Sequence, residues 1–410
     1  MRRSALFQVA WGSTYCSESR GDAVSVRVLI VAPEWPPNVV GGGGPVYERI
    51  GRFLAQRGHT VSAAFTDTSR LGWRTEPWER SVGSVSLLGL PPAPVLWNMK
   101  WLRPALPPNA RGLRRFRRLL AQPWDVAHLH AVGFPLVDFA AWVLRGRGIP
   151  YVFTAHGIPA SPLSRGFAAR TALMSYLQLV TGATIRHAAR YTAVSAAVAC
   201  SPMLPRRDAI TIHNGIDEKD FDGASDHRVA ARPLRIVSLG GLSLVKGADT
   251  VLRVMAQLRS MDIDATAAIY GHDHGDAPLL LAQRRELALD SAVEFKGPFN
   301  DEERRALLRN ADVLLAPSRV EGFGIAAVEA LAAGLPVVAS RVEGMSEVLE
   351  SCALLAPPGD PAAFAAAIRD LLDPARRATM IEHGRSAARR FLWSDILPRY
   401  EAVLESAARC

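Results

Sequence analysis

Short apolar runs alternate with helical stretches along this chain, and that alternation constrains the fold more than any other feature of the sequence. Residues 26–32 (VRVLIVA) form a nearly continuous β-branched run, which is typical of a parallel strand buried on both faces. A loop rich in proline and glycine follows, and Pro45 then opens a helical stretch over residues 46–57. Such strand, loop and helix units predict an α/β fold with a doubly wound parallel sheet.

The pattern recurs in two blocks, so that the 410 residues are expected to form two domains. We expect strands at residues 26–32, 60–65, 126–129, 151–154, 191–194 and 210–212 in the first block, and at 234–239, 265–270, 293–295, 313–315, 336–339 and 353–355 in the second. Helices are expected at residues 46–57, 136–145, 168–189, 248–258 and 381–408, among others.

The domain boundary is expected in residues 220–233, which lose apolar periodicity and gain Gly, Asp, Ser and Pro. The first Rossmann-like domain then covers residues 25–222 and the second covers residues 233–390. Residues 1–24 are interpreted as a frayed extension, and residues 391–410 as a helix that returns to the first domain. Two such domains face each other across a cleft at the carboxyl ends of their strands.

Composition narrows the class of protein further. The four cysteines are scattered without a C-x-x-C or a Cys/His cluster, which argues against a zinc site or a disulfide framework and favours a cytoplasmic protein. The longest apolar runs are far shorter than the roughly 18 to 20 residues that cross a bilayer, so no transmembrane segment is expected. A formal charge of +9 suits anionic partners. Nucleic acid is not expected among them, because no nucleic-acid-binding signature accompanies the charge.

The densest basic patch lies in residues 111–120, where five arginines alternate with leucine and phenylalanine in the pattern of an amphipathic helix. One interpretation is a solvated helix face. The other is a peripheral contact with the anionic inner face of a membrane.

The sharpest constellation follows the strand at 313–315 and reads Ser318-Arg-Val-Glu321-Gly322-Phe323-Gly324, continuing into a helix from about Ile325. The glycines allow a ligand to approach the backbone, and the helix start directs free N–H groups at an anion. Glu329 lies about one turn further along that helix. The two carboxylates therefore reach different parts of an extended ligand, such as a sugar and a ribose. In the alternative interpretation, Glu321 only caps the helix and Glu329 only pairs with a surface base.

A second glycine loop, Gly240-Gly241-Leu-Ser-Leu-Val-Lys246-Gly247, lies between the strand at 234–239 and the helix at 248–258. Lys246 next to a helix start is suited to neutralise a phosphate.

These motifs resemble those of the family 4 glycosyltransferases of the GT-B architecture. E-G-F-G-x-x-x-x-E is similar to the E-x7-E signature, and G-G-L-S-L-V-K-G is similar to G-R-L-x-x-x-K-G with glycine at 241 in place of the arginine. Further similarities are R-G-H-T-V at 57–61, D-V-A-H at 125–128, H-N-G-I-D at 213–217, G-M-S-E-V at 344–348 and P-G-D at 358–360. Together they span about residues 26–400.

The resemblance implies that the first domain lies on the acceptor side and the second on the donor side. It also implies roles for individual residues. Glu321 would hold the donor sugar, Glu329 the nucleotide ribose and Lys246 the diphosphate. His156 would contact the transferred sugar, so that Glu321, His156 and Lys246 are the catalytic candidates. Lys246 and Glu321 are also expected to bind the donor, together with Gly41, Gly42, Gly241, Gly322, Phe323, Gly324 and Glu329. His128 and His130 are interpreted as structural.

The resemblance also implies the reaction: transfer of a sugar from a nucleoside diphosphate sugar to a hydroxyl acceptor with retention of configuration. The acceptor is expected to be a polysaccharide, a lipid-linked molecule or a small metabolite. No metal or other cofactor is expected, since no D-x-D follows a strand of the first domain. A catalytically impaired scaffold remains an alternative because Gly241 replaces the arginine, and so does a GT-B-shaped epimerase or phosphorylase.

Overall fold

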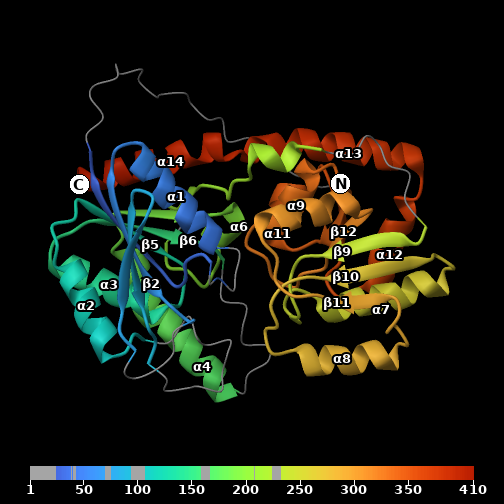
Figure 1. Ribbon diagram of the computed structural model, residues 1–410, viewed down its shortest axis with the longest axis horizontal. Helices are drawn as coiled ribbons and strands as arrows, with labels where there is room; N and C mark the ends of the chain where they lie inside the picture. Colours follow the sequence, from blue (N-terminus) through green and yellow to red (C-terminus); the bar gives the residue numbers. More distant parts are fainter. Residues whose placement is uncertain are drawn as a thin grey trace, which may run out of the picture.

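The structure is a computed structural model that describes residues 25–37, 39, 43–69, 75–93, 107–157, 167–206, 208–223 and 232–410. The proposed N-terminal extension, residues 1–24, lies outside the described residues, and so do the candidate donor-binding glycines Gly41 and Gly42. Figure 1 shows two lobes side by side, each built around its own sheet, as the alternating pattern predicts for a doubly wound α/β protein.

The first lobe is built on an eight-stranded sheet with the order β3-β4-β2-β1-β5-β6-β7-β8. All neighbouring strands pair in parallel except β3 and β4, which form an antiparallel hairpin at one edge. Its strands are β1 (Arg27–Ala32), β2 (Thr60–Thr66), β3 (Trp78–Val82), β4 (Val85–Leu90), β5 (Val126–His130), β6 (Tyr151–Ala155), β7 (Arg190–Ala193) and β8 (Ile210–Thr211).

The helices of this lobe cover both faces of the sheet, which explains why its central strands are mostly apolar and almost fully buried. They are α1 (Gly44–Gln56), α2 (Ala110–Leu120), α3 (Pro135–Gly146), α4 (Phe167–Tyr176), α5 (Gly182–Arg186) and α6 (Ala196–Ala199). The helix expected at 168–189 is not continuous: a π-helical turn, Leu177–Thr181, separates α4 from α5. The buried carboxylate of Asp138 accepts hydrogen bonds from Thr181 and Thr184 there and stabilises this turn.

The second lobe holds a six-stranded parallel sheet with the order β11-β10-β9-β12-β13-β14. Its strands are β9 (Leu234–Ser238), β10 (Ala265–Ile269), β11 (Val293–Phe295), β12 (Val313–Ala316), β13 (Val337–Ser340) and β14 (Leu354–Ala356). Its helices are α7 (Ala248–Ser260), α8 (Ala277–Glu286), α9 (Asp301–Asn310), α10 (Ile325–Ala332), α11 (Glu343–Leu349), α12 (Pro361–Asp370) and α13 (Pro374–Ala388).

The final helix, α14 (Trp393–Ala408), packs on the first lobe against α1, β5 and β6, while α13 packs on the second. The two helices run along one edge of the molecule from lobe to lobe (Figure 1). The single helix expected at 381–408 is therefore two helices, separated by a short 3-10 turn at Arg389–Phe391. Ile216, in the segment that connects the lobes, exchanges backbone hydrogen bonds with Phe391 (2.7 Å) and Trp393 (3.1 Å). Both connections between the lobes thus lie side by side.

Candidate functional site

The glycine loop after β9 presents Lys246 at the start of α7. Gly247 is the N-cap residue, and its φ of +78° favours glycine. A β-carbon on Gly247 would also stand 2.1 Å from the carbonyl oxygen of Pro317, so that this loop can lie directly on the loop after β12. As a result, the ammonium of Lys246 reaches the carboxylate of Glu321, with Nζ 2.7 Å from Oε2. The sequence-predicted cation and the first acidic residue therefore form an ion pair.

The loop that carries Glu321 is anchored by Phe323, which is 1% exposed. Its ring packs against the rings of His213 and Phe391, with centroids 5.6 Å and 5.4 Å away. Phe323 was a candidate donor-binding residue, and its side chain belongs to the core, so only its backbone is left to contact a ligand. Gly324 is the N-cap residue of α10 with a φ of +86°. The amino end of this helix is therefore directed at the same loop.

The same loop touches the first lobe. A β-carbon on Gly322 would stand 2.5 Å from the carbonyl oxygen of His156 and 3.2 Å from the Cα atom of Gly157. The carboxylate of Glu347 on α11 spans the lobes as well, accepting hydrogen bonds from the backbone N–H groups of Ala196 (3.0 Å) and Ala197 (3.2 Å). The strand ends of both lobes, with Lys246 and Glu321 on one side and His156 on the other, therefore meet in one place.

His156 lies in a cluster of buried rings. Its Nε2 atom is 3.0 Å from Nδ1 of His130, and the ring of Tyr47 contacts both imidazoles, with centroids 4.6 Å from His130 and 5.0 Å from His156. Burial lowers the pKa of His156 from 6.5 to about 3, because the charged form loses its hydration. His156 is therefore neutral at physiological pH. Its Nδ1 atom is buried and has no hydrogen-bond partner among the described residues.

His130 and Tyr47 are functional candidates that the sequence analysis missed. His130 was interpreted as structural, yet it is the hydrogen-bond partner of His156. Its place two residues after His128 at the end of β5 was the available signal, because side chains two apart lie on the same face of a strand. Tyr47 carried no such signal, since its proximity comes from the packing of α1 on the sheet.

Glu329 lies on α10, where its Oε1 atom is 2.8 Å from Nη1 of Arg304 on α9. Arg304 is itself buried and also pairs with Asp220 in the segment that connects the lobes, at 3.1 Å. Burial raises the pKa of Glu329 from 4.5 to about 7, and Asp220 and Asp301 add to the shift, whereas Arg304 opposes it. Glu329 therefore pairs with a buried base, not with the surface base of the alternative interpretation.

Gly241 has a geometry that only glycine tolerates. Its φ is +71°, and a β-carbon would stand 2.3 Å from the carbonyl oxygen of His272 in the loop after β10. The two loops are joined by a hydrogen bond from the N–H of Leu242 to that same oxygen (3.0 Å). The backbone of these two loops therefore leaves no room for an arginine side chain at position 241.

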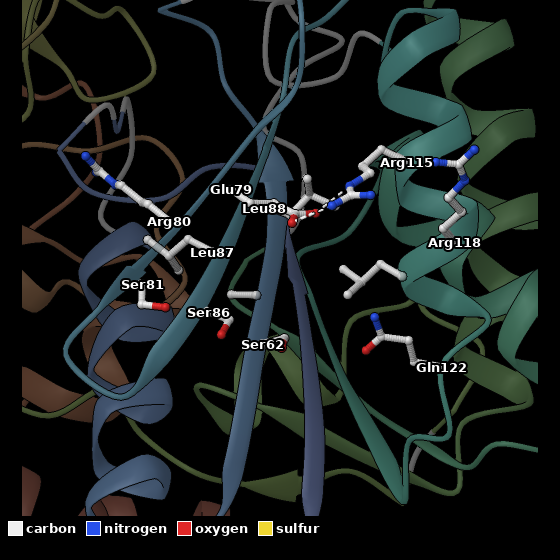
Figure 2. Close-up of a pocket in the computed structure, with 12 residues that line it drawn as sticks. Ser62, Glu79, Arg80, Ser81, Ser86, Leu87, Leu88, Arg115, Arg118 and Gln122 are labelled. Carbon is white, nitrogen blue, oxygen red and sulfur yellow. Dashed lines mark hydrogen bonds and ion pairs between the residues drawn. The ribbon is translucent and has the colours of Figure 1, made fainter.

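A separate groove of about 460 Å³ lies in the first lobe, between the edge strands and α2 (Figure 2). Serine hydroxyls from three adjacent strands line it, from Ser62, Ser86 and Ser81, and an ion pair between Glu79 and Arg115 closes one side. None of the candidate donor or catalytic residues lines this groove.

One group of three metal-ligating side chains comes together in the part of the chain that the structure describes: His59, Glu401 and Glu405. Both ring nitrogens of His59 are already engaged, since Nδ1 accepts from the N–H of Val26 (3.1 Å) and Nε2 faces Glu401 (3.1 Å). These contacts fix the Nε2–H tautomer, which cannot coordinate an ion through Nε2. The group is a clamp between the first lobe and α14.

Two doubly wound lobes whose strand ends meet define the GT-B class of glycosyltransferases, and both the expected fold class and the family resemblance are confirmed. The chain belongs to the family 4 glycosyltransferases: the family model described as Glycosyltransferase Family 4 matches residues 40–220, and the one described as Glycosyl transferases group 1 matches residues 224–387. The protein is thus a glycosyltransferase enzyme.

Similar proteins agree with this assignment. A glycogen synthase from Mycobacterium tuberculosis is 29% identical over 90% of this chain and 91% of its own length. A phosphatidyl-myo-inositol mannosyltransferase of the same organism is 29% identical over 94% of this chain and 99% of its length.

Solved structures share the fold at lower identity. Sucrose-phosphate synthase from Thermosynechococcus elongatus has a TM-score of 0.77 at 22% identity, over 93% of this chain and 98% of that one. The catalytic domain of starch synthase IV from Arabidopsis thaliana, bound to ADP and acarbose, has a TM-score of 0.69 at 15% identity, over 94% of this chain and 100% of that one.

Proposed function

We propose that this enzyme transfers a hexose-like unit from a nucleoside diphosphate sugar to a hydroxyl acceptor, with retention of anomeric configuration. The observation that carries the proposal is the ion pair between Lys246 and Glu321 beside His156 of the other lobe. A cation, a carboxylate and a neutral imidazole at the meeting point of two glycine loops suit a ligand that has an anionic diphosphate and a hydroxyl-rich sugar.

The proposed role of each residue in the site follows from its charge. Lys246 and the amino ends of α7 and α10 stabilise negative charge on the diphosphate as it departs. Glu321 accepts hydrogen bonds from sugar hydroxyls. His156, neutral because desolvation lowers its pKa, is assigned to the transferred sugar, where its carbonyl oxygen would steady developing positive charge. Glu329 holds the ribose in this proposal, with Arg304 keeping its carboxylate in place.

The chemical step follows from these positions. The bond between the anomeric carbon and the diphosphate oxygen breaks, and both electrons leave with the diphosphate. The acceptor oxygen bonds to the anomeric carbon on the same face, and its proton passes to the departing diphosphate oxygen. We infer that neither Glu321 nor Glu329, which follow one strand on a single loop and helix, acts as an in-line nucleophile on the opposite face. In this scheme Lys246 and the helix amino ends neutralise the leaving group without a metal ion.

The acceptor is proposed to belong to cell envelope synthesis, as a polysaccharide or lipid-linked molecule, and the mannosyltransferase relative supports this class. A peripheral contact with an anionic membrane on the cytoplasmic side fits the surface of the first lobe. Arg114, Arg117 and Arg118 are exposed on α2, and Trp142 on the adjoining α3 is 68% exposed. No helix among the described residues is long and apolar enough to span a bilayer.

The first experiment identifies the donor. Thermal shifts with UDP, GDP and ADP are measured, because a ligand that binds the native state raises its apparent melting temperature. The matching nucleotide sugars are then tested for release of the nucleoside diphosphate. Turnover excludes the impaired scaffold, whereas binding without turnover under any acceptor condition would contradict the transferase proposal.

Lys246→Met tests the site itself. It is expected to weaken nucleoside diphosphate binding by about 10- to 100-fold, the range for loss of one charge-assisted hydrogen bond. Lys296→Met is the matched control, because Lys296 has a similar exposure and also pairs with a carboxylate, that of Glu294. Equal affinities for the two variants would remove Lys246 from the site.

The membrane contact has its own test. Sedimentation with phosphatidylglycerol vesicles is compared with sedimentation with phosphatidylcholine vesicles. Binding to the first that is lost on replacing Arg114, Arg117 and Arg118 by Gln supports the contact, and indifference to lipid charge contradicts it.

A further inference from the structure

Arg319 joins the two loops that form the donor side of the site. Its guanidinium donates two parallel hydrogen bonds to the carboxylate of Asp249, with Nη1 to Oδ1 at 2.6 Å and Nη2 to Oδ2 at 2.7 Å. Nη1 also donates to the carbonyl oxygen of Leu244, and the backbone N–H of Arg319 donates to the carbonyl oxygen of Val245 at 2.8 Å. One residue of the Glu321 loop thus contacts both the loop that carries Lys246 and the first turn of α7.

We propose that Arg319 is a positioning residue that holds the Lys246 ammonium against the donor diphosphate. The inference rests on the proposed function, because it takes Lys246 as the diphosphate ligand. Both terminal nitrogens of Arg319 already donate to Asp249, and Nη1 donates to Leu244 as well, so we assign its guanidinium to the contact between the loops and not to the phosphate. It acts on the donor through the position of Lys246.

The composition of the Lys246 loop explains why a residue is needed to hold it. We call the contacts of Arg319 with Asp249, Leu244 and Val245 the Arg319 clamp. Residues 240–247 contain three glycines, and a glycine-rich segment loses more conformational entropy than others when it is fixed in one arrangement. Gly241 contributes no side chain, so Lys246 is the only cationic side chain within these eight residues. If the loop moved, the ammonium would move with it, and a displacement of about 1 Å is enough to lose an oriented contact.

The geometry of the Arg319–Asp249 pair indicates that it fixes the orientation of the two loops and does more than neutralise the charge of Asp249. A planar guanidinium matches a carboxylate at both ends, and it cannot rotate without breaking two hydrogen bonds at once. The Asp249 side chain is 4% exposed, so water does not compete well for this pair. The clamp therefore fixes the distance between the Lys246 and Glu321 loops as well as their attachment.

Asp249 has a second basic partner, which supplies the matched control. Arg253, one turn further along α7, also pairs with Oδ2 of Asp249, but it contacts neither loop in the described interactions. Removal of Arg253 takes one cation from Asp249 and leaves the attachment of Leu244 and Val245 intact. A general effect on the charge or stability of Asp249 would appear in both Arg253→Met and Arg319→Met, whereas an effect on loop position would appear only in the second.

The test is a double-mutant cycle on nucleotide binding. The dissociation constant is measured by calorimetry for wild type, Arg319→Met, Lys246→Met and the double variant, with whichever of UDP, GDP and ADP binds the wild type. Arg319→Met is expected to raise the dissociation constant about tenfold. In the Lys246→Met background the same change is expected to have an effect of less than about twofold, because there is no ammonium left to position. Arg253→Met is expected to leave the dissociation constant within about twofold.

The other outcomes of this experiment distinguish a failure of the proposed function from a failure of the inference about Arg319. If Lys246→Met leaves affinity unchanged, or if none of the three nucleotides binds the wild type, the proposed function of the site fails and the inference fails with it. If Lys246→Met weakens binding but Arg319→Met does not, only the inference is overturned. An equal loss from Arg319→Met in both backgrounds also overturns it, because Arg319 would then support the fold without positioning Lys246. Arg319→Lys keeps the charge without the fork and is expected to behave like Arg319→Met, so full affinity in that variant contradicts the clamp.

Discussion

Gly322 of the second lobe lies so close to His156 of the first that a β-carbon on it would stand 2.5 Å from the His156 carbonyl oxygen. The two lobes are therefore in contact at the reacting centre of the proposed site through backbone atoms. Glycine is required at this position by the approach of another chain segment, not by its own dihedral angles.

Gly322→Ala is expected to separate the two loops and to lower kcat/KM at least tenfold, because the donor and His156 would no longer lie at their working distance. Steady-state kinetics with the identified donor measure the effect. Gly297→Ala is the control, since a β-carbon on Gly297 meets nothing within 4 Å. Wild-type kinetics for Gly322→Ala would mean that the loops are not in contact during turnover.

Gly241→Arg restores the residue found in the family motif, yet it is expected to weaken the enzyme. A side chain at a φ of +71° costs about 1–2 kcal/mol, and the contact with the His272 carbonyl oxygen adds to this. The melting temperature should fall by about 3 °C or more, since 1 kcal/mol corresponds to about 2–4 °C in a domain of this size. Nucleotide affinity should fall with it. A gain in affinity at unchanged melting temperature would show that the two loops reorganise easily.

Glu329 is expected to make stability depend on pH. Its pKa is raised from 4.5 to about 7 mainly by burial, so the folded protein binds this proton more tightly than the unfolded chain does. The resulting stabilisation is complete below pH 4.5 and is lost as the pH rises through 7. Urea unfolding of wild type and Glu329→Gln at pH 5, 6, 7 and 8 should show wild type losing stability relative to the variant over this window. A constant difference between the two would contradict the shifted pKa.

Glu329 is also expected to make nucleotide affinity depend on pH. If its ionised carboxylate holds the ribose, nucleotide affinity should rise as the pH passes through about 7. Glu329→Gln should bind more weakly above that pH and should not show the rise. The charged groups that face the carboxylate are Arg304, Asp220 and Asp301, and Arg304→Met should move the rise to higher pH because it removes the cation. An unchanged nucleotide affinity in Glu329→Gln removes this residue from the site.

His128 is expected to make stability depend on pH in the opposite direction to Glu329. Burial lowers its pKa from 6.5 to about 3, so its contribution to stability is present above pH 6.5 and is lost as the pH falls towards 3. His128→Gln can keep the hydrogen bond to Thr154 without titrating, and it should lose less stability than wild type on acidification. Melting temperatures from pH 7.5 to 4.5 measure this difference. Parallel curves would show that His128 is not responsible for acid sensitivity.

The strands were predictable where both faces are buried. β1, β5 and β6 are covered on both sides, so their sequences are mostly apolar, although β5 also carries the buried His128 and His130, and they can be recognised without a structure. Strand β3 (WERSV) was missed because it is an exposed edge strand that no apolar run marks. Strand β4 (VSLLGL) is buried and apolar, and it was missed in spite of that pattern. The π-helical turn was missed because it is stabilised by Asp138, about 40 residues away along the chain.

The candidate site divides in the same way. Glu321 and Glu329 on one strand, loop and helix, and Lys246 on another, were identified from motifs, because residue type and spacing within such a unit are properties of the sequence. His130 and Tyr47 beside His156 were not, and neither was the buried Arg304 beside Glu329. Each of these partners comes from a different element. His130 is marked only by its place two residues after His128, and nothing in the local sequence marks Tyr47 or Arg304.

The sequence by itself determined that the chain forms two doubly wound α/β lobes, where the glycine loops fall, and which acidic and basic residues follow the strands. These features depend on periodicity and on the needs of single turns, which are local. Only the tertiary structure decided that Lys246 pairs with Glu321 across 75 positions, that Arg319 holds their loops together through Asp249, and that Gly241 has no room for a side chain. Such contacts depend on how separate elements pack, and a hydrogen bond between distant residues leaves no periodic trace in either segment.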